Sequence, residues 1–335
     1  MRRRGLFATG FRATGLLAPG LLASGVTLLA TPALGQGWSP RGRPITIIVP
    51  FAAGGTTDVG ARILAIALER EFATSVIVLN RAGATTQIGS TELARARPDG
   101  TTIGLMSLPS LSMTYLDTER RVPYRRESFT SIAHYIADAN LLCVPGASPF
   151  REARDLVEAA RADPAGIFVA TGGLMSNTHL AGVALERAAG VRFAYVHFNG
   201  GAPVVNALLA SEVAAGINGI NTTIPHEREG RVRVLATMGE GHTSFFPQVR
   251  TLGEQGYDVA SPSSFAVLGP AGMPAEVVAA LTGAIRNAIA DATLQRRLAD
   301  LALNASYMDP PTLDAFWAAF EARQAPLIAL ARQGG

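Results

Sequence analysis

The chain has 335 residues, of which 48% are hydrophobic and 16% charged, a composition typical of globular proteins. It has 29 basic residues, all arginine, against 26 acidic ones, and no arginine-rich block occurs beyond its start, so the footprint of a nucleic-acid-binding protein is absent. The single cysteine, Cys143, can form no disulfide within the chain, which favours a bacterial periplasm over a disulfide-stabilised secreted domain.

Residues 1–35 have the pattern of an export signal. They carry four arginines and no acid, then an apolar run that ends in the small residues Ala33-Leu34-Gly35, so we expect cleavage near Gln36. Glycines and prolines interrupt the run, so no span of roughly 20 apolar residues forms a membrane anchor. The adjacent arginines also permit twin-arginine export, although we favour the Sec route. Without this segment the net charge is −1, so the isoelectric point of 9.4 mainly reflects the leader.

From Pro44 onward, β-branched runs alternate with helical patterns. Strand-like runs occur at 45–50, 75–79 and 102–106, and helices begin between them near Thr57 and Ile88. This order predicts a parallel sheet with right-handed crossovers. The first helix, 57–70, has Val59, Ile63 and Ile66 at the spacing of a core-facing stripe.

A second series of strands and helices follows the long apolar stretch 132–146, which is either one strand or two. Strands are predicted at 167–171, 193–198, 232–238 and 264–270. Helices are predicted at 149–161, 178–188, 202–209, 274–290, 294–302 and 311–331. Two such series predict two α/β lobes, each with its own sheet.

Three strand–Gly-Gly–helix junctions stand out, at Gly54-Gly55, Gly172-Gly173 and Gly200-Gly201. The start of a helix presents unpaired N–H groups and the positive end of the helix dipole, which together attract an anion. Alternatively, each glycine pair makes a tight turn and a threonine merely caps the helix. Three junctions in one chain favour a shared anion-binding cleft built from backbone amides and small polar groups.

The first junction has only one nearby cation, Arg62, which we expect to pair with Asp58 four residues earlier. Backbone N–H groups would then hold the anion. Gly55 is expected to allow close approach and a positive φ.

Signatures of catalysis, cofactor binding and metal binding are missing. The chain has no GxGxxG, GxxxxGK[ST] or GxSxG motif, and Gly230 replaces the second histidine of a zinc motif that begins at His226. Ser176 and His179 have no obvious orienting acid, and the remaining histidines show no ligand spacing. His179 lies in the first turn of a helix, where a neutral imidazole is favoured; it is either a hydrogen-bond partner or a packing residue. We therefore predict no catalytic residue, no metal and no cofactor.

Several blocks, taken in order, resemble one family. They are VPFAAGGTTDVGAR (49–62), VIVLNRAGATTQIGSTELARARPDGTTIGLM (76–106), TGGLMSNTHLAGVAL (171–185), HFNGGAPVVNALLASEV (197–213), GRVRVLATM (230–238) and LGPAGMPAEVVAAL (268–281). This series resembles the Bug-type substrate-binding receptors of tripartite tricarboxylate transport systems and covers nearly all of the chain after residue 35.

The resemblance implies an α/β, two-lobed periplasmic-binding-protein fold of the type II-like class, with the ligand in the interlobe cleft. Residues 38–140 and 233–335 would form lobe 1, and 141–232 lobe 2. It implies an exported, monomeric receptor that captures a small organic acid and presents it to membrane permease subunits. A carboxylate-sensing partner of a signalling protein, or a hydrolase on a similar scaffold, are the alternatives.

The resemblance also implies which residues grip the carboxylate, partly through water. In lobe 1 these are Phe51, Ala53, Gly54, Gly55, Thr57, Asp58 and Ser107. In lobe 2 they are Thr171, Gly172, Gly173, Ser176, Thr178, His179, Asn199, Gly200 and Gly201.

The chain departs from the family pattern in three places. Ala82, Thr85 and Thr86 occupy a loop that is usually Gly-rich, and Phe198-Asn199 replaces a usual Tyr-Lys. The segment 210–214 lacks the acid of a usual Gly-Gly-Gln-Val-Asp. The wall of lobe 2 is therefore expected to be less charged than in the family.

Overall fold

The computed structural model describes residues 38–333. The predicted export signal, residues 1–35, lies outside the described residues. No helix in the described part is by itself long and apolar enough to cross a membrane; α8 (Ala275–Ala290) and α9 (Ala292–Asp300) reach that length and composition only as a pair bent by 70°.

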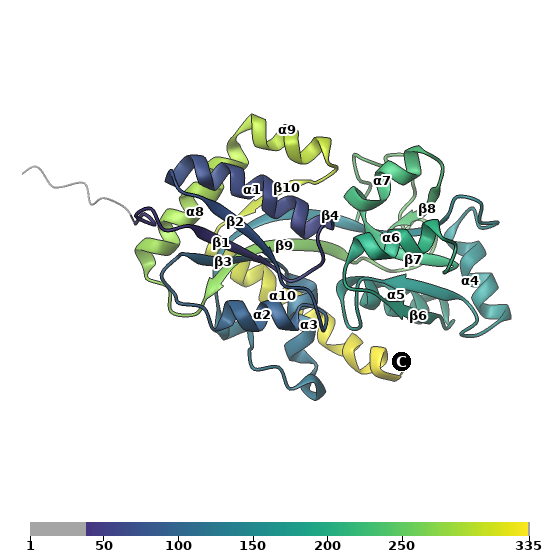
Figure 1. Cartoon of the computed structure of the whole chain (residues 1–335). Coiled ribbons are helices and arrows are strands. Elements are labelled where there is room, and N and C mark those ends of the chain that lie inside the picture. The colour runs from purple at the N-terminus through teal and green to yellow at the C-terminus, as the bar shows by residue number, and fades with distance from the viewer. Residues whose placement is uncertain (1–37, 334–335) are drawn as a thin grey trace, which may run out of the picture. The chain divides into compact units, whose positions relative to one another are not determined.

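The first sheet has the strand order β2-β1-β3-β9-β4, with β10 also paired to β4 (Figure 1). Its strands are β1 (Ile45–Val49), β2 (Val76–Asn80), β3 (Thr102–Ser107), β4 (Phe129–Pro145), β9 (Pro262–Pro270) and β10 (Ala305–Met308). The first three are parallel, as the sequence predicts, whereas β9 runs antiparallel between β3 and β4. The sheet is therefore mixed.

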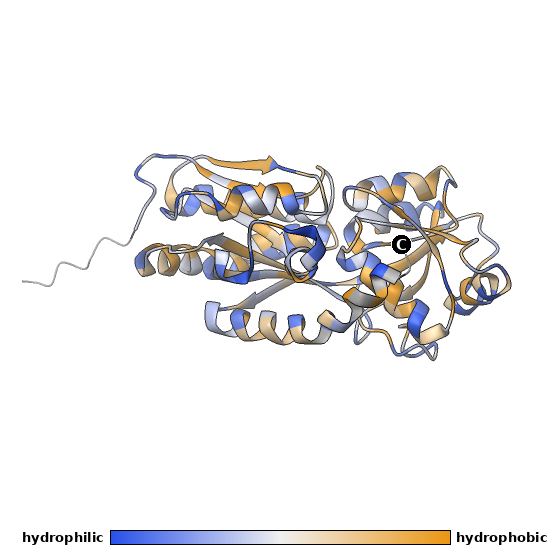
Figure 2. Cartoon of the chain, turned by 90° about the horizontal axis from the view of Figure 1, so that it is seen from below, coloured by the Kyte–Doolittle hydropathy of each residue, from blue (hydrophilic) through white to orange (hydrophobic). Residues whose placement is uncertain are grey.

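Helices cover both faces of this sheet. Figure 1 shows α8, α9 and α1 (Thr56–Phe72) on one face, and on the other α2 (Gln87–Ala94), α3 (Leu108–Leu116) and α10 (Pro310–Gln333). Short 3₁₀ turns at Thr118–Arg120 and Arg126–Ser128 precede β4. In Figure 2 the helices carry hydrophilic and hydrophobic residues side by side, as expected of helices with one face on a sheet.

The second sheet contains the C-terminal part of β4 together with four shorter strands. They are β5 (Phe168–Thr171), β6 (Ala194–His197), β7 (Ala215–Gly219) and β8 (Val232–Thr237). Its helices are α4 (Ala153–Ala162), α5 (Asn177–Ala189), α6 (Gly201–Leu209) and α7 (Ile220–Arg228).

One long strand joins the two sheets. The apolar stretch 132–146 belongs to the single strand β4 as far as Pro145; this strand pairs with β9 as far as Ala139 and with β7 from Asn140. The chain passes back from the second sheet to the first between the end of β8 and the start of β9. The predicted lobe limits stay a prediction, although β8 pairs within the second sheet.

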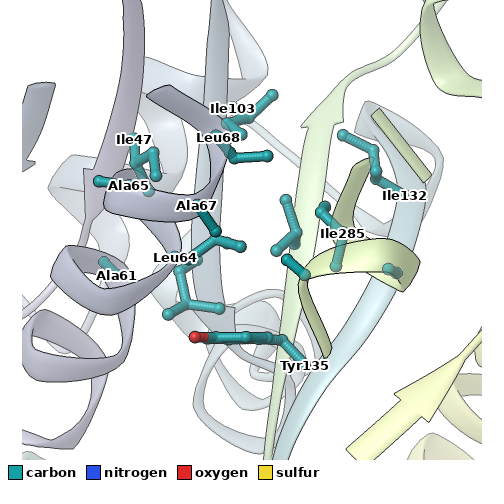
Figure 3. Close-up of a cluster of buried hydrophobic side chains, with 14 of the residues drawn as sticks. Ile47, Ala61, Leu64, Ala65, Ala67, Leu68, Ile103, Ile132, Tyr135 and Ile285 are labelled. Carbon is teal, nitrogen blue, oxygen red and sulfur yellow. The ribbon is translucent and has the colours of Figure 1, made fainter. Parts of the chain in front are cut away.

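The core of the first sheet positions α1 and with it the first Gly-Gly junction. Leu64 and Leu68 of α1 are fully buried, in a cluster with Ile47, Ile103 and Tyr135 (Figure 3). The predicted core stripe of α1 is only partly right, since Ile63 is buried but Ile66 is 42% exposed. Leu64 and Leu68 face the core instead because the i, i+4 row closest to the sheet runs through them.

Candidate ligand-binding site

A cavity of about 530 Å³, counting its open mouth, lies between the two sheets. Residues that follow the carboxyl ends of parallel strands line it, among them Phe51 after β1, Gly172 after β5 and Gly200 after β6. Ligands of open α/β sheets bind at such strand ends, where the connecting loops diverge.

Five helices begin at this cavity. The N-cap residues of α1, α3, α5, α6 and α7 all line it: Gly55, Ser107, Ser176, Gly200 and Gly219. Each helix start leaves N–H groups without intrahelical partners and carries the positive end of its dipole. Together they make the cavity electropositive without any cationic side chain.

The start of α1 shows these free donors in detail. The first helical bond of α1 runs from the Val59 N–H to the Gly55 carbonyl, at 3.0 Å. The N–H groups of Gly55, Thr56 and Thr57 precede it and have no hydrogen-bond partner within residues 38–333. They are therefore available to an anion in the cavity.

Gly54, and not Gly55, takes the positive φ at the first junction. Gly54 has φ +83°, whereas Gly55 has φ −81°, so the predicted conformation of Gly55 is wrong. A Cβ at Gly55 would lie 3.9 Å from the Gly201 nitrogen, on the opposite loop. This is an ordinary van der Waals distance, so Gly55 faces the second lobe across the cleft without a steric need for glycine, and Gly54 makes the turn.

The predicted pairing of Arg62 with Asp58 is confirmed. Arg62 donates from Nη2 to Asp58 Oδ1 at 2.9 Å and from Nε to Oδ2 at 3.1 Å, and the Gly54 N–H donates to Oδ2 at 2.9 Å. Burial alone would raise the pKa of Asp58, but the hydrogen bonds from Arg62 and Gly54 lower it below its usual value. This buried carboxylate fixes the Gly-Gly turn and does not line the cavity.

His179 is a packing residue behind the cavity. Its Nδ1 accepts the Met175 N–H at 3.0 Å, and its ring meets those of Tyr195 and His197 edge-on, with centroids 4.7 Å away in each case. Burial, and then the charges of His197 and Arg120, lower its pKa to about 3. The imidazole is therefore neutral, as its place in the first helical turn predicts.

Nine of the residues implied by the resemblance line the cavity: Phe51, Gly55, Thr57, Ser107, Gly172, Ser176, Thr178, Gly200 and Gly201. Seven lie outside the lining: Ala53, Gly54, Asp58, Thr171, Gly173, His179 and Asn199. Among these, Thr171 shares a hydrogen bond with His197 (2.7 Å), and the Asn199 carbonyl accepts the Ala52 N–H (3.3 Å).

Eight lining residues were not predicted: Thr56, Ser110, Asn140, Asn177, Asn218, Gly219, Ser263 and Phe265. Asn218-Gly219 ends strand β7 directly before helix α7, a place like that of the Gly-Gly pairs, but its single glycine hides the pattern. Asn140 and Phe265 lie inside long strands, where no local signal marks a residue that faces a cavity.

The lining is neutral throughout, since glycine, serine, threonine, asparagine and phenylalanine are its only residue types. Phe51 and Phe265 supply apolar rings, and the amides and hydroxyls supply hydrogen bonds. An anion bound here would therefore be held by the dipoles of helix N-termini and polar side chains. This agrees with the prediction that the wall of lobe 2 carries little charge.

Hydrogen bonds across the cleft show a closed arrangement. The Asn177 N–H of α5 donates to Ser110 Oγ of α3 at 3.2 Å, and Thr56 Oγ1 of α1 donates to Asn221 Oδ1 of α7 at 2.5 Å. Helices from the two sheets thus meet around the cavity.

Residues 60–332 match the family model described as the tripartite tricarboxylate transporter family receptor. The chain belongs to this family. The receptor is 33% identical over 250 residues to Protein BugT of Bordetella pertussis (strain Tohama I), a match that covers 74% of this chain and 76% of BugT.

Solved structures agree with this assignment. The periplasmic binding protein BugD is 28% identical with a TM-score of 0.79, over 86% of the receptor and 97% of BugD. The structure titled R. palustris Rpa4515 with adipate is 25% identical with a TM-score of 0.80, over 86% and 97% of the two chains. The predicted family, the two-lobed fold and the role of solute-binding receptor are thereby confirmed.

Proposed function

We propose that this receptor is exported, captures a small organic carboxylate in the cavity between its two lobes, and delivers it to the membrane permease subunits of a tripartite tricarboxylate transporter. One observation carries the proposal: five helix N-caps converge on one cavity whose lining bears no charged side chain.

A carboxylate suits this cavity in charge. Hydrogen bonds to a charged group contribute about 1.5–3 kcal/mol each, so donors from the five helix N-termini would supply a large part of the binding free energy that a micromolar affinity requires. Phe51 and Phe265 would contact the carbon skeleton.

The starts of α1 and α6 are the proposed carboxylate subsite, since Gly55 and Gly201 face each other across the cleft. The starts of α3 and α5, joined through Ser110 and Asn177, would contact the other end of the molecule. Of the residues that the resemblance implies, those that line the cavity would contact the ligand. The remaining ones would shape the loops around the cavity.

We also propose that the lobes turn about the two places where the chain passes between the sheets. One is the Ala139–Asn140 step of β4 and the other is the segment between Thr237 and Pro262. The second crossing thus follows β8, later than the limit at residue 232 that the sequence suggested.

We further propose that the receptor binds its solute without converting it and acts as a monomer. No cavity-lining side chain is an acid, a base or a cysteine, and the described residues contain no group of three His, Cys, Asp or Glu side chains suited to a metal. The solute should be recovered chemically unchanged after prolonged incubation with the receptor, as judged by mass spectrometry.

Export through residues 1–35 is part of the same proposal. Intact-mass measurement of protein recovered from the periplasm should give a chain that begins near Gln36. A full-length chain held in the membrane would contradict it.

The experiment that tests the proposal compares acids with their uncharged amides. Receptor purified from the periplasm is titrated calorimetrically with adipate, malate and citrate and with the corresponding amides. We expect at least one acid to bind and its amide to lose most of the affinity, because only the carboxylate complements the helix dipoles. Equal binding of acid and amide, or binding of neutral solutes alone, would contradict a carboxylate receptor.

A further inference from the structure

The loop between β2 and α2 has an unusual backbone. Gly83, Ala84, Thr85 and Thr86 have φ values of +136°, +46°, +46° and +67°. Left-handed backbone is unfavourable for residues with a Cβ, and most of all for β-branched threonine. Three consecutive non-glycine residues in this region need interactions that hold them there.

Two hydrogen bonds near this loop cross the cleft to the same carbonyl oxygen. Thr85 Oγ1 donates to the carbonyl oxygen of Leu174 at 2.7 Å, and Arg120 Nη2 donates to the same oxygen at 2.6 Å. Arg120 Nη1 also donates to the Ala84 carbonyl at 3.3 Å, and Asp117 pairs with Arg120 at 3.4 Å. The Leu174 carbonyl, in the loop after β5, thus accepts hydrogen bonds from Thr85 and Arg120, which belong to the part of the chain around the first sheet.

The two loops approach each other closely. A Cβ at Gly173, which has φ +148°, would lie 2.8 Å from Thr85 Oγ1, so only glycine fits opposite this threonine. Thr85 is only 8% exposed, so water competes little for its hydroxyl. Gly173, which the resemblance placed among the ligand contacts, lies against Thr85.

The same loop also reaches the cavity. Leu174 lies between Gly172 and Ser176, both of which line the cavity, and Ser176 caps α5. The position of the Leu174 carbonyl and the position of these ligand-facing residues are therefore set by one short segment.

We propose that Thr85 and Arg120, through the Leu174 carbonyl, form a latch that holds the cleft closed. They are positioning residues: they raise ligand affinity by favouring the closed arrangement and touch no ligand. A solute that binds only the closed cleft gains apparent affinity in proportion to the closed fraction. The latch concerns closure alone and does not depend on which solute is bound.

The test measures lobe closure without any ligand. Nitroxide labels are placed at the exposed positions Arg97→Cys and Arg187→Cys, and the distance distribution of periplasmically purified, ligand-stripped protein is recorded by double electron–electron resonance. Native Cys143 is fully buried and takes no label. We expect a short-distance, closed population whose ratio to the open one falls about twofold to tenfold in Thr85→Val, as for the loss of one neutral hydrogen bond.

Three further variants make the result specific. Thr85→Ser keeps the hydroxyl and should retain the closed population, whereas Arg120→Gln should lower it. Thr74→Val removes a hydroxyl that donates to Arg43, at 2.9 Å, far from the cleft, and should leave the distances unchanged. A protein with no closed population, or a folded Thr85→Val variant with the parent's distribution, would overturn the latch.

Discussion

Asp58 and Arg62 show that the cation closest in sequence to the first Gly-Gly junction is paired with a carboxylate. Arg62 donates two hydrogen bonds to the Asp58 carboxylate, which is almost fully buried. The same carboxylate also accepts the Gly54 N–H. This pair was predictable because its i, i+4 spacing is local. The φ of Gly55 was not, since which glycine of a pair makes the turn depends on how the two loops meet across the cleft.

Replacing Arg62 by glutamine should therefore affect stability more than binding. The Arg62 side chain is 54% exposed, so loss of its ion pair should lower the free energy of unfolding by only about 1 kcal/mol. Affinity should stay within a few-fold of the parent. Urea denaturation measures the change in stability and calorimetry the change in affinity, with the exposed Arg187→Gln variant as the control for both. Loss of binding in a folded Arg62→Gln protein would show that the guanidinium holds the ligand.

Asp138 gives the molecule a pH dependence at the crossing of β4. Burial raises its pKa to about 7, against smaller opposing effects of hydrogen bonds from the Ala139 N–H and Asn304. A carboxyl whose pKa is raised on folding contributes stability below its ordinary value of 3.8, and that contribution is lost as the pH rises through about 7.

Asp138→Asn is neutral at every pH and should remove this dependence. At pH 8 we expect the variant to be more stable than the parent by on the order of 2 kcal/mol, and the difference to shrink toward pH 4. Urea denaturation at both pH values measures it, with the exposed Asp258→Asn as the control. A difference that stays constant between pH 4 and pH 8 would mean that the carboxyl does not titrate as described.

At the scale of elements, the segments with strong patterns were predictable. The strands β1, β2 and β3 are β-branched runs, and all but two of the α-helices of the described part, α3 and α7, follow from periodicity or capping residues. The missed strand β7 has the sequence AGING, which contains residues that are poor strand formers, and its burial in the second sheet overrides that preference. The missed helix α7 begins directly after it. Helix α3, which begins directly after β3, and the short strand β10 were not predicted either.

The loop 83–86 yields a prediction about an element's stability. Ala84 is exposed and has φ +46°, so Ala84→Gly loses no packing and relieves an unfavourable backbone. We expect the free energy of unfolding to rise by about 1 kcal/mol. Ala279→Gly, at an exposed position inside α8, should lower it by roughly 0.5–1 kcal/mol. Urea denaturation measures both changes. If Ala84→Gly and Ala279→Gly changed the free energy of unfolding in the same direction, the left-handed conformation of Ala84 would be contradicted.

At the scale of the whole described body, the site exists only where both sheets meet. The starts of α1 and α3 come from the first sheet and those of α5, α6 and α7 from the second, so closure brings all five dipoles to one solute. The glycine pairs predicted three of these junctions. Asn140, Ser263 and Phe265 could not be found in the sequence, because only the packing of β4 against β9 turns them toward the cavity.

The most direct test of the central claim is a crystal structure of the receptor with the small acid that co-purifies with it from the periplasm. We predict carboxylate oxygens within about 3 Å of the N–H groups at the starts of α1 and α6, between Gly55 and Gly201. An acid whose carboxylate instead pairs with the guanidinium of Arg62 or Arg120, away from these helix starts, would contradict the account.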